Sequence, residues 1–447
     1  MQTIGDLEAW ATERLLGGRP DAALHAFTLL VRLQPGHLDA RLRVADCLLA
    51  LGHVQQAAQV YTALARHAAH AGHPLRAIVA IKILAALEPQ LAGLVAGLAE
   101  LYAVGAPRLG RAVRLSPGDR NAPLPPGLDL QRTADPARLA PEACRLASDT
   151  SAIAHYPAQL PPIPLFSELP ASAFGSVLAA LKLVRARGGD IVVRQGDRAQ
   201  SFFVIARGAV DVVRDEPSGP RLLATLYDGA LFGEMALLTA SPRAASVVAR
   251  QDCDLLEFDR DALRAASADP TTVATIARGL DKFARERLLA NLMATSPLFQ
   301  PFDREQRLEL LARFSAHDVT AGTPLIREGQ PGEGLFVLLS GEVQVSRESD
   351  AGRVELARLG PGDVFGEISL LHDGPTTATV TACTNATVLF LPRATFRRLV
   401  DAVPALRAWI EQLGDERMMD TRLSLASLAQ RAEAHAHPLD EDDLVPL

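Results

Sequence analysis

The sequence has little cysteine, few aromatic residues and no long uncharged apolar run. Its cysteines lie far apart, without the paired spacing of a zinc site or a disulfide framework, at Cys47, Cys144, Cys253 and Cys383. No stretch reaches the length that spans a membrane, and the N-terminus lacks the basic and apolar regions of a signal peptide. We therefore expect a reduced, cytoplasmic protein without a bound metal or cofactor.

The sequence also lacks features of two function classes. The net charge of −7 gives no global reason to bind nucleic acid or an anionic membrane. A search for a Walker loop, a kinase catalytic loop or a nucleophile elbow finds none, so we expect a protein that is not an enzyme. With 447 residues, 48% of them hydrophobic and 22% charged, the chain should form two to four ordinary globular domains.

The first 106 residues are rich in alanine and leucine and have a helical period. Small and aromatic side chains return at one interval, where Gly18, Ala23 and Phe27 recur as Gly52, Ala57 and Tyr61. This interval and the order of residue types resemble the tetratricopeptide repeat, which implies stacked helix pairs. Two to three such units are near the minimum that can bury a shared core. The module either presents a face to a protein partner or serves only for packing or oligomerisation, and the sequence favours neither.

Three histidines in this region, His67, His70 and His73, are three residues apart, a spacing that could suggest a metal site. Gly72 and Pro74 would break a helix that held them together, and no carboxylate or cysteine joins them. We therefore expect solvated surface histidines.

Residues 107–164 contain 11 prolines, which predicts an extended, semi-rigid linker with a short helix near residues 141–148. Within it, Arg111-Ala-Val-Arg-Leu-Ser116 resembles the site of a basophilic kinase. Short basic motifs occur often by chance in loops, so a solvated linker is the preferred interpretation.

From residue 165 the sequence repeats itself once, at a constant interval. Glycine and phenylalanine positions show the repeat, where Gly196, Phe203, Gly208 and Gly229 recur as Gly329, Phe336, Gly341 and Gly362. Alternating segments, such as 202–213 and 335–345, are separated by glycine turns, which is typical of a small antiparallel barrel. A helical pattern follows each barrel, at residues 261–292 and 393–413.

One stretch of the first barrel carries the chemistry. Gly233 lets the backbone approach a ligand closely, and Glu234 opens a short apolar run that Pro242 ends just before Arg243. A turn with free amides and an arginine close behind it forms a cradle for one phosphate. Because Glu234 would repel a phosphate, a sugar hydroxyl is its more suitable partner. An anion and a ribose together indicate a nucleotide.

The whole stretch, F-G-E-x-A-L followed by P-R-A-A-S-V, resembles the phosphate-binding cassette of cyclic-nucleotide-binding domains, as in the regulatory subunit of protein kinase A and the catabolite activator protein. The resemblance covers about residues 165–415. It implies that Glu234 accepts a hydrogen bond from the ribose 2′-hydroxyl, that Arg243 neutralises the cyclic phosphate with the help of backbone amides, and that the helix after the barrel closes over the base. The implied binding residues are Phe232, Gly233, Glu234, Met235, Ala236, Arg243, Ala244, Ala245 and Ser246.

The second cassette departs from this pattern. Glu367 keeps its place, but Thr376 stands where the first cassette has Arg243, and a hydroxyl cannot neutralise a phosphate. Charge-assisted hydrogen bonds contribute roughly 1.5–3 kcal/mol against about 1 for neutral ones, so affinity for an anion should fall by an order of magnitude or more. The position that offers an acid to the arginine in the family is Gln200 in the first unit and Glu333 in the second. We expect the second site to be empty or to hold a ligand without the phosphate; its residues would be Gly366, Glu367, Ile368, Ser369, Thr376 and Thr377.

These observations predict a multidomain α+β chain, with N-terminal all-α helical repeats followed by two antiparallel β-barrels of the jelly-roll type, each with flanking helices. The expected domains are tetratricopeptide-like repeats (1–106), a linker (107–164), two cyclic-nucleotide-binding domains (165–296 and 297–415) and a polar acidic tail (416–447). The expected function is that of a non-catalytic signalling receptor, which binds cAMP, cGMP or another cyclic nucleotide in the first barrel and relays this to a partner protein through the repeats.

Two other classes stay open. A regulatory subunit of a kinase or other effector enzyme has this layout of tandem domains, although the helical repeats replace the dimerisation helices of that family. A transcription regulator of the catabolite-activator type would need a basic helix-turn-helix after the second barrel, where the sequence instead has acidic residues 440–443. We therefore expect no contact with nucleic acid or membrane.

Overall fold

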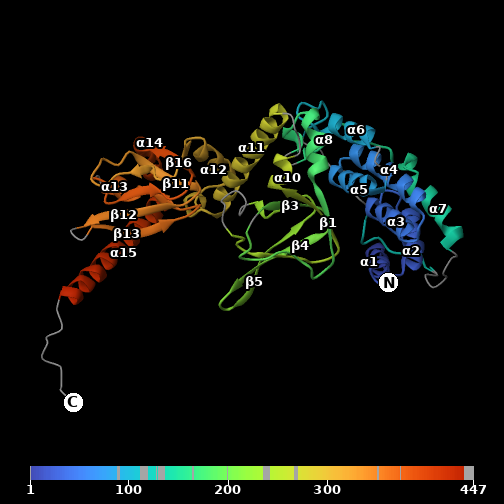
Figure 1. Cartoon of the computed structure of the whole chain (residues 1–447), viewed down its shortest axis with the longest axis horizontal. Helices are drawn as coiled ribbons and strands as arrows, with labels where there is room; N and C mark the ends of the chain where they lie inside the picture. Colours follow the sequence, from blue (N-terminus) through green and yellow to red (C-terminus); the bar gives the residue numbers. More distant parts are fainter. Residues whose placement is uncertain are drawn as a thin grey trace, which may run out of the picture. The chain divides into compact units, whose positions relative to one another are not determined.

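The computed structural model confirms the predicted fold class, with helical repeats followed by two strand-rich barrels along the sequence (Figure 1). It describes residues 2–87, 91–110, 119–126, 128, 136–163, 166–198, 200–234, 242–265, 270–349, 352–372 and 374–436. The chain divides into two compact units, Met1–Leu237 with Ser241–Phe283 and Leu238–Ala240 with Ala284–Leu447. The first unit therefore holds the repeats together with the first barrel.

The N-terminal helices form an array in which each helix packs against the next, from α1 to α6. Gly18, Gly52 and Gly72 take φ values of 74°, 84° and 84° in the turns between helices, a left-handed conformation that favours glycine. The recurring glycine of the predicted repeat is therefore a turn residue. The helices are α1 (Ile4–Leu16), α2 (Pro20–Leu33), α3 (Leu38–Ala50), α4 (Val54–His70), α5 (Pro74–Leu87) and α6 (Ala92–Tyr102).

The first barrel consists of two four-stranded antiparallel sheets, in the strand orders β1-β8-β3-β6 and β2-β7-β4-β5. Buried side chains such as Ile205, Val210 and Leu255 fill the space between them. The strands are β1 (Lys182–Ala186), β2 (Ile191–Val193), β3 (Ser201–Arg207), β4 (Ala209–Glu216), β5 (Gly219–Tyr227), β6 (Leu231–Phe232), β7 (Ser246–Ala249) and β8 (Cys253–Asp259).

The second barrel repeats this topology, with the orders β9-β16-β11-β14 and β10-β15-β12-β13. The rings of Phe336 and Phe365 stack at 5.1 Å, as Phe203 and Phe232 do in the first barrel. The strands are β9 (Ser315–Val319), β10 (Pro324–Ile326), β11 (Gly334–Ser340), β12 (Val343–Ser349), β13 (Gly352–Leu359), β14 (Val364–Phe365), β15 (Thr379–Ala382) and β16 (Ala386–Pro392). Most of them start where the sequence repeat places the counterpart of a strand in the first barrel, as β11 does for β3.

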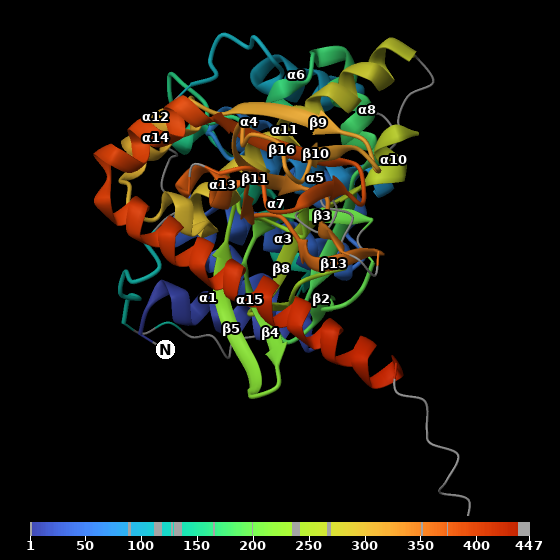
Figure 2. The ribbon, with the colours of Figure 1, turned by 90° about the vertical axis from the view of Figure 1, so that its left-hand side faces the viewer.

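The predicted helical segment 261–292 is observed as α10 and α11, while the helical segment after the second barrel is longer than the sequence pattern suggests. The predicted second helical segment, 393–413, is observed as α14 and α15, and α15 continues to Ala436 as one helix (Figure 2). Residues 416–436, predicted as tail, are therefore helical. The helices around the barrels are η2 (Phe166–Glu168), α8 (Ala171–Ala180), α10 (Arg260–Arg264), α11 (Pro270–Thr295), η3 (Pro297–Phe299), α12 (Arg304–Leu311), α13 (Glu367–Leu371), α14 (Arg393–Ala402) and α15 (Pro404–Ala436).

Part of the proline-rich segment packs on the repeats, and the short helix expected near residues 141–148 is observed there. Its helix α7 (Pro136–Ser148) lies against α2, α3 and α4, and η1 (Ser151–Ile153) follows it. The buried Arg41 of α3 donates hydrogen bonds to the carbonyl oxygens of Ala147 at 2.7 Å and Asp149 at 2.8 Å, which satisfies the C-terminal end of α7. Buried alanine side chains explain why this segment docks although it has few aromatic residues. The kinase-like motif, residues 111–116, lies outside the described residues.

The prediction of solvated histidines is wrong for two of the three. His67 and His73 are buried, and the His67 ring lies 5.5 Å from the Tyr156 ring, in the segment that follows α7. Burial, with Arg41 nearby, lowers the pKa of His67 to about 4, so its ring is neutral at pH 7. In the part of the chain that the structure describes, no group of histidine, cysteine or acidic side chains has the arrangement of a metal site.

The repeats contact the first barrel through a buried network of charges. Arg43 of α3 pairs with Asp46 at 2.7 Å and with Asp252, and Arg207 of β3 pairs with Asp252 and Asp254, both at 2.7 Å. Arg185 of β1 bridges Asp46 and Asp254 at 3.0 and 3.1 Å. Alternating charges of this kind compensate for the loss of hydration, whereas loss of one partner would leave a charge buried without compensation.

A second contact ties the repeats to the loop that leads into the first cassette. Arg76 of α5 pairs with Asp39 of α3 at 2.7 Å and with Asp228 at 2.8 Å. Burial would raise the pKa of Asp39, but the Arg76 guanidinium holds it at about 2. Asp228 lies between β5 and β6 and accepts a hydrogen bond from the Gly208 amide at 2.7 Å.

Across the helices described, none is both long and apolar enough to cross a membrane.

Candidate ligand-binding sites

The first cassette begins where β6 ends. β6 pairs with β3, which places Gly233 directly after a strand whose Phe232 is fixed by stacking on Phe203. Gly233 has a φ of 82°, and a Cβ atom there would lie 2.6 Å from Nη1 of Arg243. Any other residue would therefore displace the arginine as well as strain the backbone. Glu234 follows and is 5% exposed.

Arg243, near the C-terminal end of the cassette, extends its guanidinium to Gly233. Its backbone N–H donates to Asp197 O, and its carbonyl accepts from Gly196 N–H, both at 2.9 Å, which fixes the residue against the turn after β2. The guanidinium donates to the carbonyl oxygens of Gly233 and Ser201, the latter at 2.6 Å. The glycine and the arginine of the motif therefore contact each other directly.

The charge of Arg243 is held in a poorly solvated place. The side chain is 7% exposed, and burial lowers its pKa, whereas nearby carboxylates, Glu234 among them, act in the opposite direction. Hydrogen bonds to neutral carbonyls only partly compensate a buried charge. An anion at this point would compensate it fully, so the geometry suits a phosphate.

The remaining predicted residues of the first cassette have different positions. Ala244 is exposed and Ala245 half-buried, while Ser246 opens β7 and its hydroxyl accepts from the Gln195 amide at 3.0 Å. Met235 and Ala236 lie outside the described residues. The side chain of Gln200 is exposed, and it is the carbonyl of the next residue that contacts Arg243.

The second cassette also begins with a glycine of positive φ, but it has a different set of charges. Gly366 has a φ of 90°, and Glu367 is 2% exposed at the start of α13. Arg417 of α15 pairs with Glu367 at 2.9 Å and also donates to the Val364 carbonyl. A cation is therefore present at this site, but it comes from the C-terminal helix, 50 residues away in the sequence.

The hydroxyl of Thr376 does not substitute for an arginine. It is buried and contacts the carbonyl oxygens of Arg327 and Gln330, the latter at 3.1 Å, and it accepts from the Gln330 amide at 3.2 Å. Its one proton is used within the turn after β10. Ser369 similarly donates to the Gly366 carbonyl at 3.2 Å, and Ile368 and Thr377 line the adjacent cavity.

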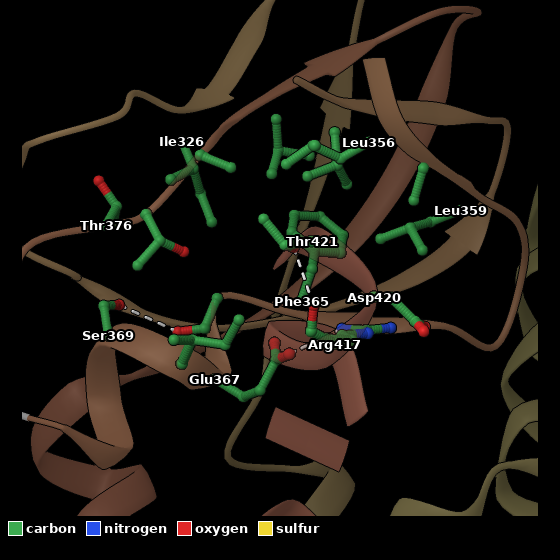
Figure 3. A pocket seen from close by; sticks show the side chains of 17 residues that line it. Ile326, Leu356, Leu359, Phe365, Glu367, Ser369, Thr376, Arg417, Asp420 and Thr421 are labelled. Atoms are coloured by element: carbon green, nitrogen blue, oxygen red, sulfur yellow. Dashed lines mark hydrogen bonds and ion pairs between the residues drawn. The ribbon is translucent and has the colours of Figure 1, made fainter. Parts of the chain in front are cut away.

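This cavity, of about 150 Å³, lies between the second cassette and α15 (Figure 3). The cassette supplies Glu367 and Thr376, the barrel supplies apolar side chains such as Leu356 and Leu359, and α15 supplies Arg417, Asp420 and Thr421. The helix is thus part of the wall of the site, as the family resemblance predicts for a helix that closes over a ligand.

Comparisons with known proteins identify the domains of the chain. The family model described as "Cyclic nucleotide-binding domain" matches residues 183–269 and 316–402, and the model described as "Tetratricopeptide repeat" matches residues 15–79. The "cAMP-dependent protein kinase regulatory subunit" of Dictyostelium discoideum is 30% identical over 240 residues, which cover 53% of this chain and 70% of that protein. The chain belongs to the family of proteins with cyclic nucleotide-binding domains.

Other relatives match the same region. The protein of that name from Yarrowia lipolytica is 33% identical over 243 residues, which cover 54% of this chain and 59% of that protein. The chain therefore spans only part of the length of these relatives. Among solved structures, the regulatory domain of Toxoplasma gondii PKA with cAMP matches 56% of this chain and 92% of that one at 22% identity, with a TM-score of 0.27. Such a TM-score supports no argument about function.

Within this cyclic nucleotide-binding fold, Arg417 and Asp420 line the cavity, and the sequence analysis did not single them out. Each follows residue 413, where the helical pattern was predicted to end, in a segment whose polar residues resemble a solvated tail. The spacing between Glu367 and Arg417 belongs to no motif used for the prediction. Leu406 and Ile410, fully buried at the start of α15, are apolar residues four positions apart, as expected of a docked helix.

Proposed function

We propose that the chain is a non-catalytic cyclic-nucleotide receptor whose first barrel binds cAMP. The observation that carries this proposal is Arg243, which is buried, fixed by its backbone and adjacent to Gly233 and Glu234. In this arrangement Arg243 meets the cyclic phosphate and Glu234 accepts from the ribose hydroxyl. The names of the relatives, regulatory subunits of cAMP-dependent protein kinase, support the same ligand.

Calorimetric titration of the full chain with cAMP, cGMP and cyclic dinucleotides tests this function. We expect cAMP to bind with saturation and cyclic dinucleotides to bind weakly, because the single cradle contains one buried arginine for one phosphate. Absence of cAMP binding to the folded chain would overturn the proposal.

The relay to a partner rests on the contact between the repeats and the first barrel. Arg76 joins α5 to Asp228, and Asp228 lies four residues before Phe232 in the loop that leads into the cassette. A ligand that moves this loop changes a partly buried ion pair, and therefore changes the free energy of docking of the repeats. In the proposed relay, the repeats pass this change to a partner protein.

Hydrogen exchange of α5 with and without cAMP tests the relay. In the wild-type chain, cAMP should change the exchange rates of α5, and Arg76→Met should remove that change while binding persists. Arg19→Met is the matched control, since it removes an exposed ion pair with Asp21 in the same module. Equal responses of α5 in Arg76→Met and wild type would contradict the relay.

A kinase catalytic subunit is the partner that the relatives' names favour, which is the second candidate function. Affinity capture with the full chain, with and without cAMP, tests it. Co-purification of a kinase that cAMP changes supports a regulatory subunit; specific retention of DNA would instead support a transcription regulator.

A further inference from the structure

The cavity of the second barrel has one apolar part and one charged part. Val345, Leu356, Leu359 and Val380 line the apolar part, and the cassette with α15 lines the rest (Figure 3). A flat heterocycle with a polar substituent therefore suits both parts.

The charged side chains of the cavity disfavour an anion. Glu367 and Asp420 each carry one negative charge and Arg417 one positive charge, so the wall has a net charge of −1. The charge of Arg417 is already paired with Glu367 at 2.9 Å. A phosphate brought here would compete for a paired cation and meet two carboxylates, at close range and partly out of water.

The wall of the cavity offers hydrogen-bond acceptors that the described part of the protein itself does not use. An ionised carboxylate has about four lone-pair positions, so Glu367 can accept from sugar hydroxyls beside its pair with Arg417. The proton of Thr376 is used by backbone carbonyls, and that of Thr421 by the Arg417 carbonyl at 2.8 Å. Hydrogen-bond donors on a ligand would therefore find acceptors in this wall.

We propose that the second barrel binds an uncharged purine nucleoside, with guanosine preferred over adenosine. The ribose hydroxyls donate to Glu367, and the base enters the apolar part below α15. Asp420, an acceptor-only group at the rim, receives the adjacent N1–H and N2–H donors of guanine. Adenine offers a donor next to an acceptor there, and so makes one of the two bonds. This inference concerns the second barrel and is independent of cAMP binding in the first.

Titration of the full-length Arg243→Ala chain with guanosine, adenosine and cAMP tests the proposal, because this variant silences the first cassette. We expect guanosine to saturate near one equivalent and cAMP to be the weakest of the three ligands. Guanosine should bind about tenfold more tightly than adenosine, which corresponds to one additional charge-assisted hydrogen bond. Cyclic AMP binding the variant more tightly than guanosine would overturn it, as would no guanosine binding to a folded variant.

Two variants locate the ligand. Glu367→Gln should weaken guanosine at least about tenfold, whereas Glu234→Gln, the same change in the first cassette, should leave guanosine binding unchanged. Asp420→Asn, on the exposed face of α15, should reduce the preference for guanosine without affecting folding. Guanosine binding that responds to Glu234 and ignores Glu367 and Asp420 would place the ligand in the first barrel and refute the proposal. Failure of cAMP to bind the wild-type chain, in contrast, bears only on the first cassette.

Discussion

Substitution of Arg243 is the most direct test of the first site. Arg243→Ala removes the one cassette charge that faces the expected phosphate, together with two hydrogen bonds to the carbonyls of Gly233 and Ser201. The residue is 7% exposed, so water replaces little of what is lost. Binding and folding should respond differently.

The expected loss of cAMP affinity follows from the burial of the Arg243 charge. Truncation of one partner in a desolvated charge pair costs roughly 2–5 kcal/mol, which corresponds to about 30- to 4,000-fold in Kd. Without ligand, the same guanidinium donates to two neutral carbonyls, and burial lowers its pKa while nearby carboxylates act in the opposite direction. Its removal should therefore destabilise the free protein by no more than about 1–2 kcal/mol. Glu234→Ala should weaken binding less than Arg243→Ala, because Glu234 meets a neutral hydroxyl.

Calorimetry with cAMP at fixed ionic strength, alongside thermal unfolding of the free chain, separates the two effects. Arg250→Ala is the control, since it removes the same charge from an exposed position of the same barrel. We expect Arg250→Ala to bind as wild type does. Binding of cAMP by Arg243→Ala within threefold of wild type would refute the assignment of the cassette.

Three further predictions concern stoichiometry, base preference and pH. The second cassette has Thr376 at the position of Arg243, so calorimetry should show one strong equivalent of cAMP per chain. Two equal sites would contradict this. We expect cAMP over cGMP, and Ala244→Thr should shift competition toward cGMP by up to roughly tenfold by adding one hydroxyl; an unchanged ratio would place base selection elsewhere. His67 is buried with its pKa lowered from 6.5 to about 4, so the unfolded chain binds more protons between these values. Stability should thus be complete above pH 6.5 and fall by up to about 3 kcal/mol toward pH 4, a loss that His67→Asn should reduce in denaturant titrations.

The barrels could be predicted because their determinants are local and occur twice. Glycines with positive φ, such as Gly196 and Gly208, end strands at fixed distances, and their counterparts in the second barrel, Gly329 and Gly341, have the same conformation. The contact between Gly233 and Arg243 in the first cassette is also local, since the two residues lie close together in the sequence. Both residues of the contact therefore lie within one short motif.

The interface and the second site depend on pairs that are distant in sequence. Arg43 and Asp252 meet from 209 residues apart, and neither has a neighbour in sequence that indicates the other. Arg41 binds the end of α7 through backbone carbonyls, which every residue has, so the sequence does not indicate this contact. Proline content likewise predicts a stiff segment but says nothing of where it docks.

The source of the cation distinguishes the two cassettes in a way that has consequences for signalling. In the first, Arg243 is fixed by its own backbone to the turn after β2, so a phosphate finds its partner whether or not a helix has closed. In the second, the cation is Arg417 of α15, and it is present only while that helix is docked. Undocking of α15 would leave Glu367 without its partner and remove Asp420 and Thr421 from the wall. A ligand that fits the closed wall therefore favours docking of the helix by as much as its affinity differs between the two states. On the proposed function, the first cassette recognises a charge, whereas in the second the position of α15 depends on the occupant.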